Sequence, residues 1–127
     1  MFSPSQITLD DFQELVEEAL LTLPDEISSV MDNVAVTVAE HPSAAQRRAV
    51  RLKPGQALYG LYQGVPLTRR ATNYGMVPPD RITIFMYPMV YNHHTPEAIR
   101  RQVRRTVLHE IGHHFGMDED HLRRLGY

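Results

Sequence analysis

Residues 109–119 read His-Glu-Ile-Gly-His-His-Phe-Gly-Met-Asp-Glu, and they lie at the end of the longest helix that the sequence predicts. This helix is expected to begin at Thr95, where Thr-Pro-Glu places an N-cap, a first-turn proline and an acid in the order that a helix start prefers. It should run to about Phe115 and stop at Gly116, because glycine accepts a left-handed backbone. An apolar stripe with a spacing of four residues is expected to pack against the core: Ile99, Val103, Val107 and Ile111.

The same segment contains an HExxH motif, with His109 and His113 four residues apart. Residues with this spacing lie one above the other on a helix, so both imidazoles can share one metal ion. Both positions lie outside the apolar arc, although ordinary surface histidines are the alternative interpretation. Glu110 flanks the site and can hold a water molecule without binding the metal. His114 falls within the apolar arc and is expected to be packed and hydrogen-bonded rather than a ligand.

Zinc is the metal that this pattern favours. A catalytic zinc ion has three protein ligands and keeps a fourth position for water, whose pKa falls to about 7. The chain contains no cysteine, so its ligands must be His, Asp or Glu. The third ligand must come from beyond the turn at Gly116, where the candidates are Asp118, Glu119, Asp120 and His121.

Length and composition narrow the class of protein. A chain of 127 residues predicts one domain, spanning residues 1–127. The absence of cysteine excludes a disulfide framework, an iron–sulfur centre and a cysteine nucleophile. A net charge of -2 argues against a protein that binds nucleic acid or membranes mainly through phosphate groups. No signal peptide or membrane-spanning stretch is recognisable, so a soluble, cytoplasmic protein is expected.

Hydrophobic periodicity predicts the remaining elements. Thr8 can cap an amphipathic helix that extends to Leu23 and is ended by Pro24, while residues 25–31 are ambiguous. Runs of β-branched residues predict three strands, at 33–39, 57–62 and 81–87. Residues 40–55 are expected to form a loop, with room for a turn of helix, and residues 118–125 a short last helix. This order indicates an α+β fold.

The run from His109 to Glu119 resembles the HExxHxxGxx(H/D) signature of the zincin metallopeptidases, in the extended form of the metzincins and of relatives with an acidic third ligand. More narrowly, the chain is similar to a small bacterial family of possible zinc metallopeptidases. The similarity lies in HEIGHHFG and the acidic cluster after it, in Leu122-Arg-Arg-Leu-Gly, and in the upstream Ile82-Thr-Ile-Phe-Met-Tyr-Pro. The resemblance implies a minimal zincin-like fold. A short mixed sheet of three to four strands would pack on an N-terminal helix and a C-terminal active-site helix.

The resemblance also implies roles for individual residues. His109 and His113 match the zinc ligands, Glu110 matches the general base and Gly116 matches the turn. Glu119 falls at the third-ligand position and departs from the usual Asp or His. Metzincins carry a methionine turn downstream of the motif, whereas Met117 lies within the motif and is expected only to pack.

A zinc-dependent peptidase acting on peptide or protein substrates is therefore expected. One alternative is a zinc-binding protein without proteolytic activity, because so short a chain leaves little material for a cleft. Another alternative is an RNA-processing metallohydrolase. Its only support is a basic patch, which consists of Arg100, Arg101, Arg104 and Arg105. A solvated helix face that forms ion pairs with the acidic first helix is the simpler interpretation of this patch. Residues 58–62 or 82–87 could form an edge strand that aligns the substrate. His93 and His94 are expected to be exposed.

Overall fold

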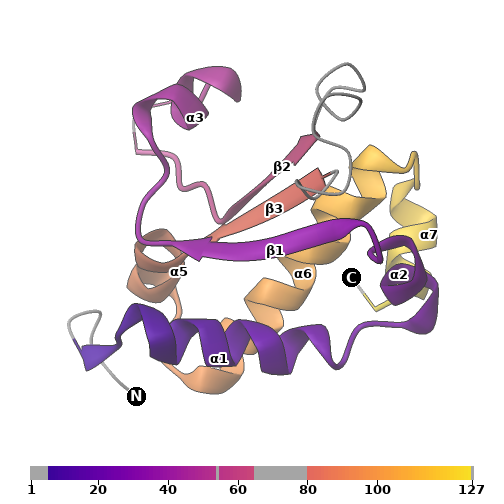
Figure 1. Cartoon of the computed structure of the whole chain (residues 1–127), viewed down its shortest axis with the longest axis horizontal. Helices are drawn as coiled ribbons and strands as arrows, with labels where there is room; N and C mark the ends of the chain where they lie inside the picture. The colour runs from indigo at the N-terminus through magenta and orange to yellow at the C-terminus, as the bar shows by residue number, and fades with distance from the viewer. Residues whose placement is uncertain (1–5, 54, 65–79, 127) are drawn as a thin grey trace.

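The computed structural model describes residues 6–53, 55–64 and 80–126, which form helices around a three-stranded sheet (Figure 1). The helices are α1 (Leu9–Leu20), α2 (Asp25–Val30), α3 (Ala44–Ala49), α5 (Met86–Asn92), α6 (Pro96–His114) and α7 (Glu119–Arg124). The strands are β1 (Val34–Ala39), β2 (Gly60–Gly64) and β3 (Asp80–Phe85). The expected α+β class is confirmed. No helix in these ranges is long and apolar enough to cross a membrane.

The sheet is mixed and has the order β1-β3-β2. The central strand β3 pairs in parallel with β1, where Val34 lies opposite Asp80, and antiparallel with β2, where Gly60 lies opposite Ile84. Of the two segments expected to serve as an edge strand, the one at 82–87 has its first four residues in the central strand β3. The described edge next to α6 is therefore β2.

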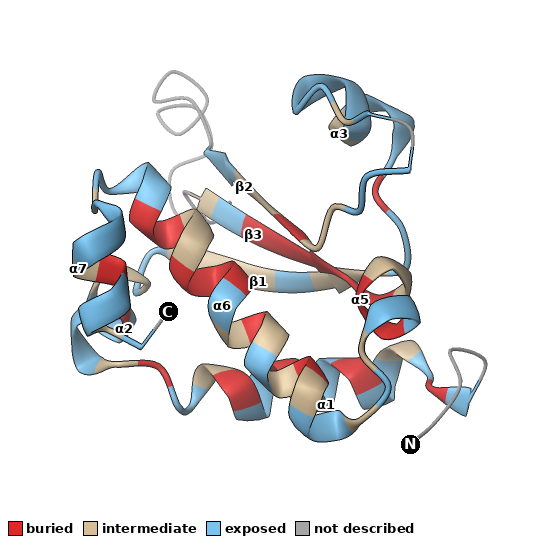
Figure 2. Ribbon diagram, turned by 180° about the vertical axis from the view of Figure 1, so that it is seen from behind, coloured by how far each residue is buried: buried red, intermediate tan, exposed pale blue. Residues whose placement is uncertain are grey.

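Helices α1 and α6 pack against each other and against the sheet (Figure 2). The predicted apolar stripe of α6 is fully buried, as are the sheet residues Ile82 and Ile84. On α1 the core positions are Phe12 and Val16, with exposed fractions of 0% and 2%. Burial of a side chain of this size contributes about 1.5–3 kcal/mol, so the contact between these helices is a large part of the core.

The first helix forms as expected at its beginning but ends earlier. Thr8 accepts a hydrogen bond from the backbone N–H of Asp11 at 3.1 Å and Asp11 returns one, which completes a capping box. The helix ends at Leu20 rather than Leu23, because the Thr22 hydroxyl donates to the carbonyl of Ala19 at 2.7 Å and closes a turn there. Pro24 then precedes α2.

Two strand predictions were wrong in their bounds. Met86 and Tyr87 begin α5 instead of extending β3, and Pro88 fits because the first turn of a helix needs no N–H bond. The strand predicted at 57–62 is shifted to Gly60–Gly64. Its first residue packs closely on α6, since a Cβ atom at Gly60 would lie 2.6 Å from Cγ2 of Thr106.

Candidate metal centre and active site

Helix α6 presents two histidines on one face. Thr95 accepts a hydrogen bond from the N–H of Ala98 at 3.1 Å and Pro96 occupies the first turn, as the sequence predicts. The helix continues through the motif to His114, so His109 and His113 lie one turn apart. Their ring centroids are 4.0 Å apart.

The chain then turns back toward these histidines. Gly116 has a φ of 73°, the left-handed conformation expected of it. The N–H of Met117 donates to the carbonyl of Gly112 at 2.7 Å, which closes the turn. Asp118 caps α7 by accepting from the N–H of His121 at 2.8 Å. Glu119 is the first residue of α7 and follows the turn directly.

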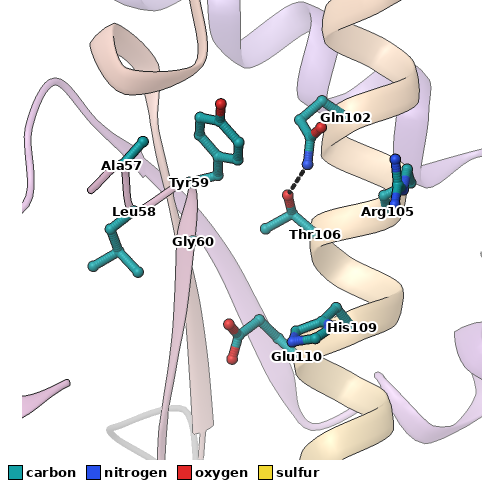
Figure 3. Close-up of a pocket in the computed structure, with 9 residues that line it drawn as sticks. All are labelled: Ala57, Leu58, Tyr59, Gly60, Gln102, Arg105, Thr106, His109 and Glu110. Atoms are coloured by element: carbon teal, nitrogen blue, oxygen red, sulfur yellow. Dashed lines mark hydrogen bonds between the residues drawn. The ribbon is translucent and has the colours of Figure 1, made fainter. Parts of the chain in front are cut away.

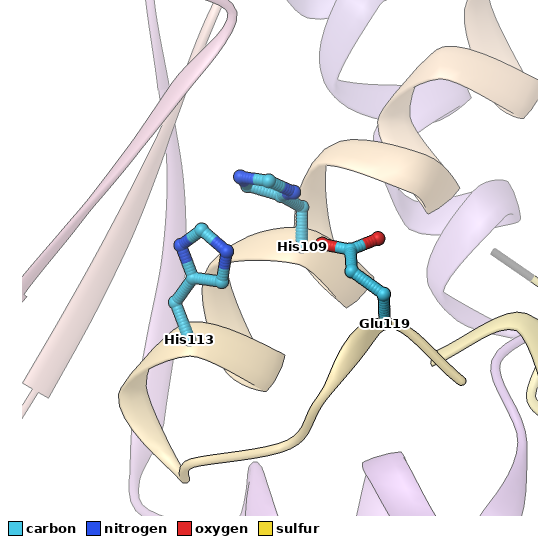
Figure 4. A group of neighbouring side chains, drawn as sticks. All are labelled: His109, His113 and Glu119. Carbon is cyan, nitrogen blue, oxygen red and sulfur yellow. The ribbon is translucent and has the colours of Figure 1, made fainter. Parts of the chain in front are cut away.

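The side chains of His109, His113 and Glu119 converge in front of α6 (Figure 4). One potential ligand atom from each residue lies within 4.8 Å of the others. Two imidazole nitrogens and a carboxylate oxygen form a donor set that suits zinc and leaves a coordination position for water. The geometry thus fits the expected metal, while ligation itself stays a prediction.

The other candidates for a third ligand have different partners. Asp118 serves as the cap of α7. The Asp120 carboxylate pairs with Arg123 at 2.9 Å. Nε2 of His121 lies 2.8 Å from Oε1 of Glu26 on α2. Asp118 and Asp120 thus bond within α7 and His121 bonds to α2, whereas Glu119 is the carboxylate that lies with the two histidines.

The electrostatics of the cluster favour neutral imidazole at His109. Burial lowers the pKa of His109, the neighbouring His113 lowers this pKa further and Glu119 opposes the shift. Arg105, one turn earlier on α6, adds a smaller lowering effect on the same pKa. Metal ions bind the unprotonated ring, so these effects prepare His109 to be a ligand at neutral pH.

Glu110 follows His109 on α6, and its carboxylate points toward the strand that carries Gly60 (Figure 3). Burial raises the pKa of its carboxyl group, while a hydrogen bond from the Tyr62 backbone and the charge of His113 lower this pKa. Glu110 also lines a cavity of about 320 Å³ between α6 and the segment that leads into β2. The lining comprises residues 57–60 and, from α6, Gln102, Arg105, Thr106, His109 and Glu110. A partly buried carboxylate beside an open cavity is suited to proton transfer.

His114 takes part in a cluster that sequence analysis did not foresee. Its ring stacks on Tyr62 with a centroid distance of 4.0 Å, and its Nε2 lies 3.8 Å from Oδ2 of Asp80. The Tyr62 hydroxyl donates a hydrogen bond to the same carboxylate. The expected ring packing of His114 is confirmed by this stacking on Tyr62, whereas 42% of its side chain is exposed and its contact with Asp80 is longer than a hydrogen bond. Three distant segments meet here, so no local signal in the sequence could reveal the cluster.

The other histidines and the basic patch lie outside the donor group. Nδ1 of His93 is 2.9 Å from the carbonyl oxygen of Met89, and His93 is only partly exposed. Nε2 of His94, which is exposed as expected, is 3.0 Å from the carbonyl oxygen of Tyr91. Arg100 pairs with Glu18 of α1 at 3.6 Å, and Arg104 donates to the carbonyls of Thr22 and Leu125. The predicted pairing with the acidic first helix is thus confirmed for Arg100.

Comparison with protein families gives one match. The model of a family described as zincin-like metallopeptidase matches residues 31–127, well over half of the chain. The matched region contains the whole sheet, α6, the turn at Gly116 and α7. Comparison with curated proteins gives no match.

Proposed function

Since this chain belongs to the zincin-like metallopeptidase family, we propose that it is a zinc-dependent peptidase. His109, His113 and Glu119 hold the metal, and Glu110 is the general base. The observation that carries this proposal is the convergence of the three donors within 4.8 Å, with Glu110 next to them on the same helix. Glu at the third position departs from the usual Asp or His, and the Glu119 carboxylate nevertheless reaches the two histidines.

The residues divide the chemistry between them. Zinc held by His109, His113 and Glu119 would supply Lewis acidity, which makes water a nucleophile at neutral pH and stabilises negative charge on a carbonyl oxygen. Glu110 accepts the proton of the attacking water at a carboxylate oxygen and delivers it to the amine that leaves. The burial of Glu110 raises its pKa toward the operating pH, which is the condition for an efficient exchange of that proton.

Strand β2 supplies a place for the substrate backbone. Within the described residues it pairs with β3 alone, and the backbone of Tyr62 bonds the carboxylate of Glu110. Because Gly60 packs against Thr106, an extended peptide would pair with β2 beyond Gly60, next to Glu110 and the metal ligands of α6. The arrangement would place a scissile bond beside Glu110.

The decisive test combines metal analysis with an assay of hydrolysis. Protein purified without a histidine tag should contain about one zinc ion per chain, and it should cleave an unfolded protein substrate in a zinc-dependent manner. Glu110→Gln should retain zinc and lose cleavage, whereas Glu97→Gln, in the exposed first turn of the same helix, should change neither. Zinc binding without any cleavage would contradict the peptidase proposal. Lack of zinc after reconstitution would contradict the metal site as well.

A further inference from the structure

The cavity beside Glu110 extends along α6 away from the metal cluster (Figure 3). Its volume of about 320 Å³ lies at the lower end of the range for ligand pockets, roughly 300–1,000 Å³. His109 and Glu110 line one end of the cavity. A substrate side chain bound in the cavity would therefore belong to a residue close to the bond that is cleaved. This position makes the cavity a candidate for reading one substrate side chain.

The walls of the cavity are polar and fixed in place. Gln102 donates a hydrogen bond to the Thr106 hydroxyl at 3.1 Å on the α6 side. The opposite wall carries Tyr59, whose ring contacts His93 edge to face with a centroid distance of 5.5 Å. Gly60 lets the strand approach Thr106 so closely that the two elements close the cavity at that level. A ligand group would therefore meet an amide and hydroxyl groups in a defined geometry.

Among the described residues, two with ionisable carboxylate or guanidinium groups line the cavity: Glu110 at the end nearest the metal cluster, and Arg105 one turn before His109. Of the described residues that line the cavity, Arg105 alone is permanently positive. Its charge reaches His109, whose pKa it helps to lower. Arg100 and Arg101 line a separate cavity between α1 and α6. A guanidinium group at this place attracts carboxylates and repels lysine and arginine side chains.

We propose that this cavity binds an acidic side chain of the substrate residue next to the scissile bond, with Arg105 as the residue that determines this specificity. The inference rests on the proposed peptidase function, because only that function places a scissile bond beside Glu110. The amide of Gln102 is the second donor available to the carboxylate. A free C-terminal carboxylate has the same chemistry, so the test must separate the two sources.

The experiment uses the zinc-loaded full chain and sets of peptides that differ only by Glu, Gln or Lys at each position next to the cleaved bond. Each peptide is made with a free and with an amidated C-terminus. Glu peptides should have a kcat/KM about three- to tenfold higher than Gln peptides at one position, and Lys peptides the lowest. Amidation should leave this preference unchanged. A preference that follows the free C-terminus instead would assign the cavity to a terminal carboxylate and overturn the side-chain proposal.

Variants then test Arg105 itself. Arg105→Gln should abolish the difference between Glu and Gln peptides, and Arg105→Glu should reverse the preference toward Lys. Arg101→Gln, which removes an exposed arginine outside the cavity, should keep the preference of the natural chain. An unchanged preference in Arg105→Glu would overturn the proposal.

A second measurement separates this inference from the peptidase proposal. Analogues of the same peptides with a reduced, uncleavable peptide bond are bound to the zinc-loaded chain and followed by fluorescence anisotropy. Tighter binding of the Glu analogue, lost in Arg105→Gln, would support the acidic cavity even if no peptide is cleaved. Cleavage without any discrimination between Glu and Gln, in rates and in binding, would leave the peptidase standing and refute the cavity assignment.

Discussion

Gly112 lies within the HExxH segment and directly under Leu122 of α7, and its replacement by alanine should weaken metal binding. A Cβ atom at residue 112 would lie 2.6 Å from Cδ2 and 2.9 Å from Cδ1 of Leu122. The Leu122 side chain is fully buried, so it cannot swing away into solvent. Carbon atoms normally approach to about 3.5–4.0 Å, which means that α7 must move by about 1 Å to admit the new methyl group.

Two opposing effects set the stability of the Gly112→Ala variant. Alanine is favoured over glycine inside a helix by about 0.8–1.0 kcal/mol. Overpacking of a filled core costs about 1–3 kcal/mol, and the separation at Leu122 is short enough to place this site in the upper half of that range. The free energy of unfolding should therefore fall by about 1 kcal/mol, although the substitution improves helix propensity.

The effect on metal affinity should be larger. Glu119 precedes Leu122 by three residues, so both lie on the same face of α7. A shift of about 1 Å is half of a zinc–oxygen distance of about 2.0–2.2 Å. Disturbing a residue that orients a ligand typically lowers metal affinity by about 10–100-fold, and we expect a loss of that size in Gly112→Ala.

Competition with a chelator measures the zinc affinity and urea titration measures the stability. Gly64→Ala is the control, because among the described residues a Cβ atom there meets only Oδ1 of Asp80, at 3.4 Å. Adding Leu122→Ala should restore zinc affinity to Gly112→Ala, and in a Glu119→Ala background the Gly112 substitution should cause no further loss. A Gly112→Ala protein that is more stable by about 1 kcal/mol and binds zinc normally would refute the reasoning.

The remaining predictions concern the base, the third ligand and the first helix. Burial raises the pKa of Glu110, so the carboxyl group binds its proton more tightly in the metal-free folded chain than in the unfolded chain. The free energy of unfolding should therefore fall as the pH rises from the pKa of Glu110 in the unfolded chain to its pKa in the folded chain. Urea titrations across that range should show a flatter profile for Glu110→Gln, and identical profiles would contradict this linkage. Glu119→Ala should lower zinc affinity by at least about tenfold, as judged by chelator competition, and Asp120→Ala by less than about twofold; equal losses would mean that Glu119 is not the third ligand. Thr8→Ala removes the capping box of α1 and should cost about 1 kcal/mol of unfolding free energy, whereas unchanged urea stability would show that the cap contributes nothing.

The features that could be predicted from the sequence are those that local rules determine. Thr95 begins α6, Gly116 ends it with a left-handed backbone, and the spacing of His109 and His113 places both rings on one face. The third donor follows within the same continuous segment, so Glu119 could be proposed before the fold was known. A site encoded in one short run of residues needs little knowledge of distant contacts.

The features that escaped prediction depend on contacts between distant segments. The close packing of Gly60, the first residue of β2, on Thr106 of α6 is a contact that no strand propensity reports. The cluster of Tyr62, Asp80 and His114 joins two strands to the end of α6. The cavity beside Glu110 forms where α6 packs against the segment before β2. The sequence did not distinguish Arg105, which lines this cavity, from the other arginines of α6.

The exposed edge of β2 has a further consequence for self-association. An edge that accepts one extended peptide can also accept a strand of another copy, and such pairing is the first step of edge-to-edge aggregation. Strand β2 has five residues, with a glycine at each end. Short strands and glycines are unfavourable for extending a ladder. Within the described residues, the length of β2 therefore limits intermolecular pairing to a few hydrogen bonds, which disfavours a growing stack of chains.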